Sequence, residues 1–207
     1  MNDVLRNGRR IGLFGGSFDP VHIAHLTLAH SALADLALDD LRWIPAGQPW
    51  QKSRQLAEPK HRARMIELAI ADPHLGDPRF RLETCELERP GPSYTIDTVL
   101  ALQQREPGQQ WFVLIGQDQY AGLHSWYRWR DLLDHVRIAV ALRPGASLEI
   151  DMEVARHGFE RLHMPPVELS STLLRERLAA NQPIIDLVPA AVAGYIDSHR
   201  LYRTPAG

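Results

Sequence analysis

Residues 15–25 have the sequence Gly-Gly-Ser-Phe-Asp-Pro-Val-His-Ile-Ala-His, and the rest of the chain is organised around them. They follow a short apolar run, residues 11–14, and precede a long stretch of apolar residues with helical spacing. This order predicts a strand, a tight turn and a helix. Gly15 and Gly16 allow the backbone to turn tightly and a ligand to approach closely. Backbone N–H groups in such a turn, with a helix N-terminus behind them, favour phosphate.

Two histidines follow the turn. Asp19 and Pro20 are predicted to be the N-cap and the first residue of the helix. His22 and His25 are three residues apart, so they are expected on one face of its first turn, pointing back at the glycines. Two imidazoles beside a phosphate-sized site indicate phosphate chemistry. A plain turn, a metal site or a solvated helix face remain alternatives.

Two familiar phosphate-binding fingerprints are missing from the sequence. The glycine spacing at the turn differs from the G-x-G-x-x-G of dinucleotide-binding folds. Lys52-Ser53 resembles the end of a P-loop, but Ala46 and Gln51 stand where that motif needs glycine. A different kind of phosphate site is therefore expected.

Length and composition limit the class of protein. A chain of 207 residues, 44% hydrophobic and 23% charged, suits one globular α/β domain with a core. Its 23 basic and 25 acidic residues give a net charge of −2, without the basic excess of nucleic-acid binders. The single Cys85 excludes an internal disulfide, and we find neither a signal peptide nor an apolar run of about 18 residues. We predict a cytoplasmic protein that binds neither nucleic acid nor membranes.

Strand and helix patterns alternate along the chain, which predicts βαβ units and a parallel sheet. The predicted strands cover residues 11–14, 41–45, 80–87, 111–115, 137–142 and 159–163. The predicted helices cover residues 22–38, 58–72, 94–105, 172–180 and 189–199. We expect a single domain over residues 1–207, with a helical part at about 165–207.

In open parallel sheets, ligands bind beyond the carboxyl ends of the strands. Asp118 follows the apolar strand at 111–115 and could accept a hydrogen bond from a ribose hydroxyl. The sequence Ser-Trp-Tyr-Arg-Trp at 125–129 also follows that strand, and Pro-Ser-Tyr-Thr at 92–95 opens a helix. An aromatic cluster is usually core, but the interleaved polar residues favour a rim with a stacking face.

A second motif, Glu-Leu-Ser-Ser-Thr-Leu-Leu-Arg, spans residues 168–175. Ser170, Ser171 and Thr172 are natural helix caps. Arg175 is expected in the first turn, where the helix dipole disfavours a cation, so an anion between them is indicated. A solvent-facing arginine is the alternative.

Taken together, these motifs resemble one family. Residues 15–25 resemble the signature of the nucleotidyltransferases with paired histidines, although Ala24 replaces a glycine of the pattern. From about residue 11 to residue 203 the chain resembles the bacterial nicotinate-nucleotide adenylyltransferases, whose C-terminal ATP motif is similar to residues 169–175. The resemblance implies a Rossmann-like open parallel sheet with helices on both faces and a small C-terminal helical extension. It also implies in-line adenylyl transfer from ATP to nicotinate mononucleotide, without a covalent intermediate.

The resemblance assigns roles to individual residues. Those expected to act in catalysis are His22, His25, Lys52 and Arg175. Those expected to bind ATP are Gly15, Gly16, Ser17, Phe18, His22, His25, Gly116, Asp118, Ser170, Ser171, Thr172 and Arg175. Those expected to bind the nicotinate nucleotide are Tyr94, Thr95, Trp126, Tyr127, Lys52 and Arg143.

Within these roles, Trp126 would stack on the pyridine ring, and backbone N–H groups near Thr95 and Tyr127 would bind its carboxylate. The family's usual Pro-Pro-His before Lys52 is replaced by Pro-Trp-Gln. Mg²⁺ should arrive with ATP, held mainly by phosphates and water, with no metal site of the protein's own.

Two other functions remain open. The pantetheine-phosphate adenylyltransferases resemble the same turn, but they usually have threonine for the first histidine, a shorter chain and neither aromatic motif. A regulatory module could keep the nucleotide site without turnover, although retention of both histidines, Lys52 and Arg175 argues against it. A homo-oligomer is compatible with the sequence.

Overall fold

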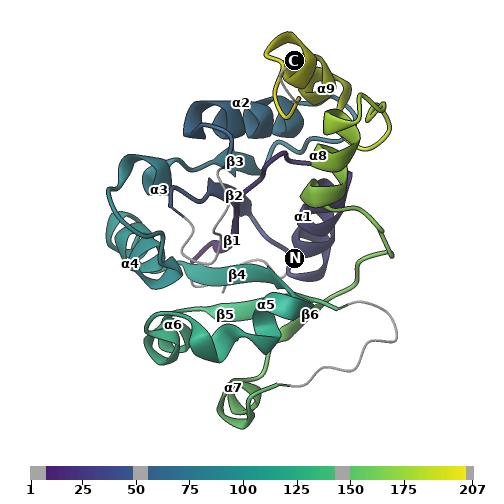
Figure 1. Cartoon of the computed structure of the whole chain (residues 1–207). Coiled ribbons are helices and arrows are strands. Elements are labelled where there is room, and N and C mark those ends of the chain that lie inside the picture. The colour runs from purple at the N-terminus through teal and green to yellow at the C-terminus, as the bar shows by residue number, and fades with distance from the viewer. Residues whose placement is uncertain (1–7, 49–55, 143–149, 204–207) are drawn as a thin grey trace, which may run out of the picture.

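A six-stranded parallel sheet forms the centre of the chain in the computed structural model, which describes residues 8–48, 56–142 and 150–203 (Figure 1). The strand order is β3-β2-β1-β4-β5-β6, and every neighbouring pair is parallel. The strands are β1 Arg10–Gly16, β2 Asp40–Pro45, β3 Phe80–Leu82, β4 Gln110–Gly116, β5 Arg137–Ala141 and β6 Glu160–Leu162. The chain runs outward from β1 to β3 and then crosses back to β4, so the strand order reverses between β1 and β4. Ligand sites of open α/β sheets lie at such a point.

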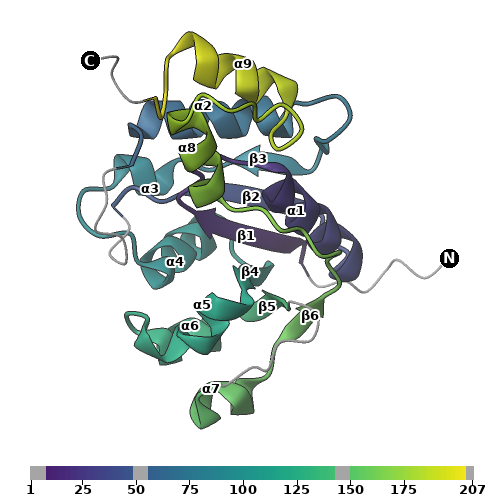
Figure 2. The same cartoon turned by 45° about the vertical axis from the view of Figure 1, so that its right-hand side comes forward.

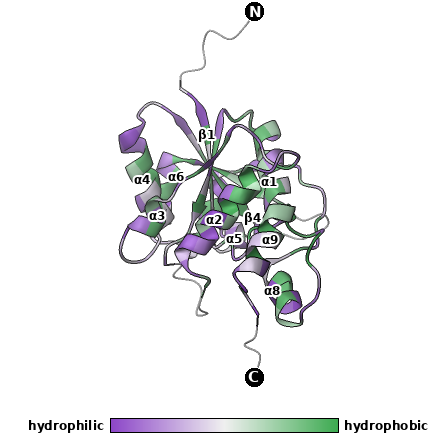
Figure 3. Cartoon of the chain, turned by 90° about the horizontal axis from the view of Figure 1, so that it is seen from above, coloured by the Kyte–Doolittle hydropathy of each residue, from purple (hydrophilic) through white to green (hydrophobic). Residues whose placement is uncertain are grey.

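Helices cover both faces of the sheet, as predicted. They are α1 Ile23–Asp35, α2 Pro59–Ile70, α3 Cys85–Glu88, α4 Thr95–Arg105, α5 Gln117–Ala121, η1 Leu123–Ser125, α6 Trp129–His135, α7 Met152–His157, α8 Ser171–Ala179 and α9 Ala190–Ser198. Seen from above, α4 and α6 lie on one side of the sheet and α1 and α8 on the other (Figure 3).

Two hydrophobic clusters correspond to these two faces. Side chains alternate along β1, so Phe14 joins the cluster under α1 and α2, whereas Leu13 joins the cluster under α4 and α6. The C-terminal helix α9 lies beside α2 (Figure 2). Leu174 of α8 and Ile196 of α9 belong to the first cluster. Residues at both ends of the chain therefore share one core. The central strand β4 is buried from residue 111 to residue 115, as expected for a strand covered on both faces.

The prediction of a strand over residues 80–87 was wrong beyond Leu82. The last residue of β3 paired with β2 is Leu82, opposite Trp43, and one further hydrogen bond joins the Glu83 N–H to the Trp43 carbonyl. After that, the Thr84 carbonyl accepts from the N–H groups of residues 87 and 88, and α3 forms. The alternation of apolar residues continued, but the pairing with β2 did not, although β2 itself runs on to Pro45.

The first helix is shorter than the predicted 22–38. It ends at Asp35, because Ala37 adopts a left-handed backbone with φ 46° and the Leu38 N–H bonds to the Leu33 carbonyl. Four short helices, α3, α5, α6 and α7, were not predicted. Each spans at most seven residues, too few for a helical period to be distinct. In the part of the chain that the structure describes, no helix has the length and apolar character needed to cross a membrane.

Candidate active site

A cavity of about 890 Å³ opens at the carboxyl ends of β1 and β4, where the strand order reverses. It is lined by the turn after β1, the start of α1, the starts of α4 and α5, and residues 164–175. The two motifs at 15–25 and 168–175 therefore meet in one place. Ligands of open α/β sheets bind at this place.

The turn after β1 is built differently from the prediction. The helix begins at Ile23 with His22 as its N-cap, so Asp19 and Pro20 are not the cap and first residue. Asp19 is instead fully buried, and its carboxylate Oδ1 accepts hydrogen bonds from the Ala57 N–H at 3.2 Å and the Tyr202 hydroxyl at 2.7 Å. Its carboxylate satisfies groups far away in the sequence and does not cap the helix.

The glycines and Phe18 shape the floor of the turn. Phe18 has φ 45° and is buried against Phe14 and Trp43. A Cβ on Gly16 would lie 3.0 Å from the Phe18 ring, whereas a Cβ on Gly15 would meet nothing within 4 Å. Gly16 is thus required for packing, and Gly15 keeps the cavity wall open. Gly15, Gly16 and Ser17 line the cavity, and Phe18 supports them from beneath.

His22 and His25 form a stacked pair in the cavity wall. Their ring centroids are 3.7 Å apart and the planes differ by 27°. The His22 backbone N–H donates to His25 Nδ1 at 3.2 Å, so a neutral His25 ring carries its proton on Nε2. His22 is only 4% exposed, and its Nδ1 is buried with no hydrogen-bond partner among the described residues. Burial lowers the pKa of His22 from 6.5 to about 4, which keeps this ring neutral at pH 7.

Arg175 is bound to the turn from the other end of the sequence. Its Nη1 donates to the Asp19 carbonyl at 2.8 Å and its Nη2 to Thr172 Oγ1 at 2.9 Å. It is the fifth residue of α8, beyond the first turn in which it was predicted, but its side chain reaches back toward the helix N-terminus. Ser170 is the predicted N-cap and accepts from the Leu173 N–H at 3.2 Å.

A further bond joins the two motifs. The Ser171 hydroxyl donates to the Pro20 carbonyl at 3.0 Å. Ser170, Ser171, Thr172 and Arg175 all line the cavity. The start of α8 therefore rests on the backbone of residues 19–20.

The same cavity holds two of the predicted acceptor residues, Thr95 and Trp126. Gly116 and Asp118, predicted to bind ATP, also line it, and Gly116 is the N-cap of the short α5. Tyr94 and Tyr127 do not belong to the lining. Their rings lie against each other at 4.4 Å, and Tyr127 is 51% exposed. Lys52 and Arg143, both predicted to bind the nicotinate nucleotide, lie outside the described residues.

Comparison with known proteins identifies the family. The cytidylyltransferase-like family model matches residues 13–177. A probable nicotinate-nucleotide adenylyltransferase of Methylibium petroleiphilum is 51% identical over 96% of this chain and 95% of its own length. One of Bordetella petrii is 47% identical over 94% of this chain and all of its own length. The chain belongs to the nicotinate-nucleotide adenylyltransferase family.

A solved structure supports the fold of this adenylyltransferase family member. The nicotinic acid mononucleotide adenylyltransferase of Plasmodium falciparum, complexed with NaAD, aligns with a TM-score of 0.76. The alignment covers 94% of this chain and 97% of that one at 20% identity, so the likeness concerns the fold.

Three residues of the adenylyltransferase cavity region were not predicted from the sequence. Glu86 lines the cavity, is buried, and accepts from Thr98 Oγ1 at 2.7 Å; burial raises the pKa of its carboxyl. Ser93 Oγ accepts from the Gly47 N–H at 2.9 Å and joins the loop after β2 to the start of α4. Glu86 falls in the segment that was incorrectly predicted as a strand. The sequence around Ser93 gives no sign that its hydroxyl bonds to the loop after β2.

The neutral state of His22 has a consequence for stability. The unfolded chain binds a proton at His22 below about pH 6.5, whereas the folded chain does so only below about pH 4. The unfolded state therefore holds more protons between these values, so the free energy of unfolding decreases by about 3 kcal/mol as the pH is lowered from 6.5 to 4. We expect His22→Gln to show a smaller loss of unfolding free energy between pH 6.5 and pH 4 than the natural chain in urea titrations. Parallel curves for the two proteins would contradict a buried neutral His22.

Proposed function

We propose that this chain transfers the adenylyl group of ATP to nicotinate mononucleotide in NAD biosynthesis, releasing pyrophosphate and forming the deamido dinucleotide. One observation carries the proposal. The histidine pair and Arg175, 150 residues apart in the sequence, line one cavity whose far wall holds Thr95 and Trp126. A phosphate-binding end and an aromatic end in one cavity suit two nucleotides meeting head to head. The relatives named above carry this activity in their names.

The reaction is an in-line displacement at the α-phosphorus of ATP. A phosphate oxygen of the mononucleotide attacks, a new P–O bond forms, and the bond to the β-phosphate bridging oxygen breaks. With a second pKa of about 6, a phosphate monoester is largely deprotonated at pH 7, so no general base is needed. Catalysis then consists of positioning and of stabilising charge on the transferring phosphoryl oxygens.

The cavity residues divide this work. Backbone N–H groups of residues 15–18 hold the phosphates at the end of β1. His25 donates through Nε2, and His22 donates one ring proton, both to α- and β-phosphate oxygens. Arg175 lies at the start of α8 and binds the departing pyrophosphate, with Lys52 as its partner from the loop after β2. Asp118 accepts from a ribose hydroxyl.

ATP enters as its Mg²⁺ complex. The described residues include no group of three or more His, Cys, Asp or Glu side chains able to hold a metal ion. Phosphate oxygens and water would supply most of the ligands, because Mg²⁺ usually keeps several waters and is bound through substrate phosphates. Bound there, the ion neutralises charge on the leaving pyrophosphate. The single cysteine fits an enzyme of the reducing cytoplasm.

The acceptor end selects a pyridine ring with a carboxylate. Trp126 stacks on the ring, and N–H groups near Thr95 and Tyr127 donate to the carboxylate oxygens. An amide would present its own NH₂ to one of these donors and leave it unpaired, so the acid is preferred.

Trp126→Ala should raise the KM for nicotinate mononucleotide several-fold to about tenfold, because stacking of aromatic rings is worth about 0.5–1.5 kcal/mol beyond area burial. The KM for ATP should change much less, since the ATP end lies across the cavity. Initial rates with each substrate varied in turn measure both constants. Equal shifts for both substrates would mean that Trp126 is part of the core rather than of the acceptor site.

Trp129 is the matched control for this variant. It is only 8% exposed, packs in the cluster under α4 and α6, and carries the Arg130 guanidinium 4.4 Å from its ring. Trp129→Phe should lower the melting temperature and leave the ratio of the two KM values unchanged.

Pyrophosphate release tests the whole proposal. The purified chain is supplied with MgATP and, separately, nicotinate mononucleotide, nicotinamide mononucleotide or pantetheine phosphate. We expect release with the nicotinate nucleotide and less with its amide. Release only with pantetheine phosphate would assign the chain to the other adenylyltransferases, and no release with any acceptor would indicate a binding module.

A further inference from the structure

The end of the chain reaches back to the turn after β1. The Tyr202 hydroxyl donates to Asp19 Oδ1 at 2.7 Å, across 183 residues of sequence. The same oxygen accepts from the backbone N–H of Ala57, at the end of the loop that follows β2. Asp19 itself has no exposed surface. One buried carboxylate oxygen thus joins the phosphate turn, the end of a loop and the C-terminal segment.

The backbone that delivers Tyr202 is held in an unusual conformation. Arg200 and Tyr202 have φ values of 51° and 63°, in the left-handed region that residues with side chains rarely adopt. The Leu201 N–H bonds to the Ile196 carbonyl at 3.0 Å, and Leu201 and Tyr202 pack against the first hydrophobic cluster. Such conformations persist where the surroundings fix them. The position of Tyr202 is therefore fixed both by the backbone around it and by the packing of its side chain.

The hydroxyl of Tyr202 is protonated at neutral pH and acts as a hydrogen-bond donor. Burial and the adjacent Asp19 carboxylate raise its pKa above the ordinary value, so the proton remains on the oxygen. A buried carboxylate needs such donors, because leaving it short of one incurs the cost of desolvation.

The backbone at Asp19 and Pro20 holds two residues that are proposed to bind ATP. Its carbonyl accepts from Arg175 Nη1 at 2.8 Å, and the next carbonyl, of Pro20, accepts from the Ser171 hydroxyl at 3.0 Å. His22 follows two residues later. The orientation of Asp19 therefore sets where Arg175 and the start of α8 lie relative to the histidine pair.

We propose that Tyr202 is a positioning residue for adenylyl transfer, which fixes Arg175 and the phosphate turn by holding the Asp19 carboxylate. This inference rests on the proposed function. Neither Tyr202 nor Asp19 lines the cavity, so Tyr202 acts through its neighbours and not by touching substrate.

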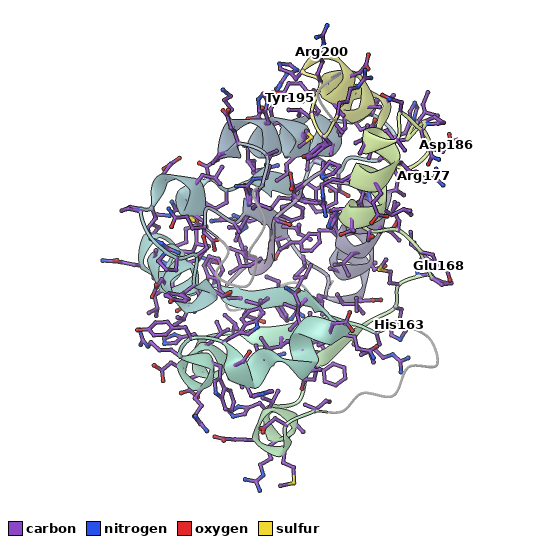
Figure 4. The ribbon with its side chains drawn as sticks, in the orientation of Figure 1. His163, Glu168, Arg177, Asp186, Tyr195 and Arg200 are labelled. Atoms are coloured by element: carbon purple, nitrogen blue, oxygen red, sulfur yellow. The ribbon has the colours of Figure 1, made fainter. Side chains whose placement is uncertain are left out.

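The test compares Tyr202→Phe with Tyr195→Phe. Tyr195, on the C-terminal helix α9 (Figure 4), is a matched control. Its hydroxyl also joins the C-terminal segment to another part of the chain, through a hydrogen bond of 2.8 Å with Nδ1 of His61 on α2. Each variant removes one hydroxyl. Both should lower the melting temperature by a few degrees. Only Tyr202→Phe should lower kcat/KM for ATP, by about tenfold, as expected for the loss of a hydrogen bond to a charged group. The KM for nicotinate mononucleotide should change by less than about twofold, because Thr95 and Trp126, which are proposed to bind it, line the cavity, whereas Asp19 does not.

A double-mutant cycle with Asp19→Asn tests the route of this effect. Asparagine at this position keeps an oxygen that can accept from Tyr202 but lacks the charge, so if Tyr202 acts through Asp19, the double variant should lose clearly less kcat/KM for ATP than the sum of the two single losses. Additive losses, or equal kinetics for Tyr202→Phe and Tyr195→Phe, would overturn the inference while leaving the proposed function intact. A natural chain that releases no pyrophosphate from ATP and nicotinate mononucleotide would overturn the proposed function and this inference with it.

Discussion

His25→Ala should lower the turnover of the chain by roughly 10²–10³, the loss seen when one preorganised donor to a transition state is removed. The reason lies in the ring's tautomer. The His22 N–H holds His25 Nδ1 as an acceptor, so Nε2 carries the proton and is the donor to the phosphates in the proposed complex. Alanine removes the donor and leaves a gap beside the His22 ring. Pyrophosphate release at saturating substrate measures the effect on the soluble variant.

His30→Ala is the matched control for this prediction. His30 lies on the same helix, α1, but its Nε2 bonds to the Leu75 carbonyl at 2.9 Å and its ring does not line the cavity. Its loss should lower the free energy of unfolding. Turnover should stay within about twofold of the natural value, because His30 bonds to Leu75, whereas the ring of His25 bonds to His22. Near-normal turnover in a folded His25→Ala protein would exclude the catalytic role. Stoichiometric zinc in the natural chain would favour a metal site for the pair.

Arg175→Ala should raise the KM for ATP by at least about tenfold, because hydrogen bonds to charged groups are worth about 1.5–3 kcal/mol. The guanidinium is held by the Asp19 carbonyl and Thr172 at the mouth of the phosphate turn, where it faces the β- and γ-phosphates in the proposed complex. The KM for nicotinate mononucleotide should change much less. Initial rates with ATP and with the mononucleotide varied in turn measure the two KM values.

Arg177 offers a control on the same helix. It lies two residues further along α8, on the side away from the sheet, and does not line the cavity (Figure 4). Arg177→Ala should leave both KM values unchanged. A loss in Arg175→Ala that falls only on the mononucleotide would place the arginine at the wrong end of the site.

The strongly periodic segments and the two motifs could be predicted from the sequence because their signals are local. Residues 111–115 are continuously apolar, so β4 was predicted correctly, and Ser170 has the side chain that an N-cap needs. The convergence of residues 15–25 and 168–175 followed from one rule about strand ends and from the resemblance to a family. The roles assigned to Lys52 and Arg143 stay predictions.

The errors arose where distant contacts override local preference. Asp19 before Pro20 has the local signature of a helix start, yet a hydroxyl 183 residues away makes it a buried hydrogen-bond acceptor. Arg175 was expected in the first turn of a helix, but α8 starts at Ser171, so Arg175 lies beyond that turn. Its long side chain still reaches the Asp19 carbonyl. Glu86 could not be recognised because β3 stops pairing with β2 after Leu82. The alternating pattern of residues 80–87 gives no sign of that end.

The transfer of the adenylyl group itself can be followed most directly with ATP labelled at the α-phosphorus. The chain is mixed with the labelled MgATP and nicotinate mononucleotide, quenched in acid at short times, and its protein and nucleotide fractions are separated. We predict that the label passes straight into the deamido dinucleotide, with none attached to protein at any time. Label bound to the protein, or released as free adenosine monophosphate without dinucleotide, would contradict direct in-line transfer between the two nucleotides.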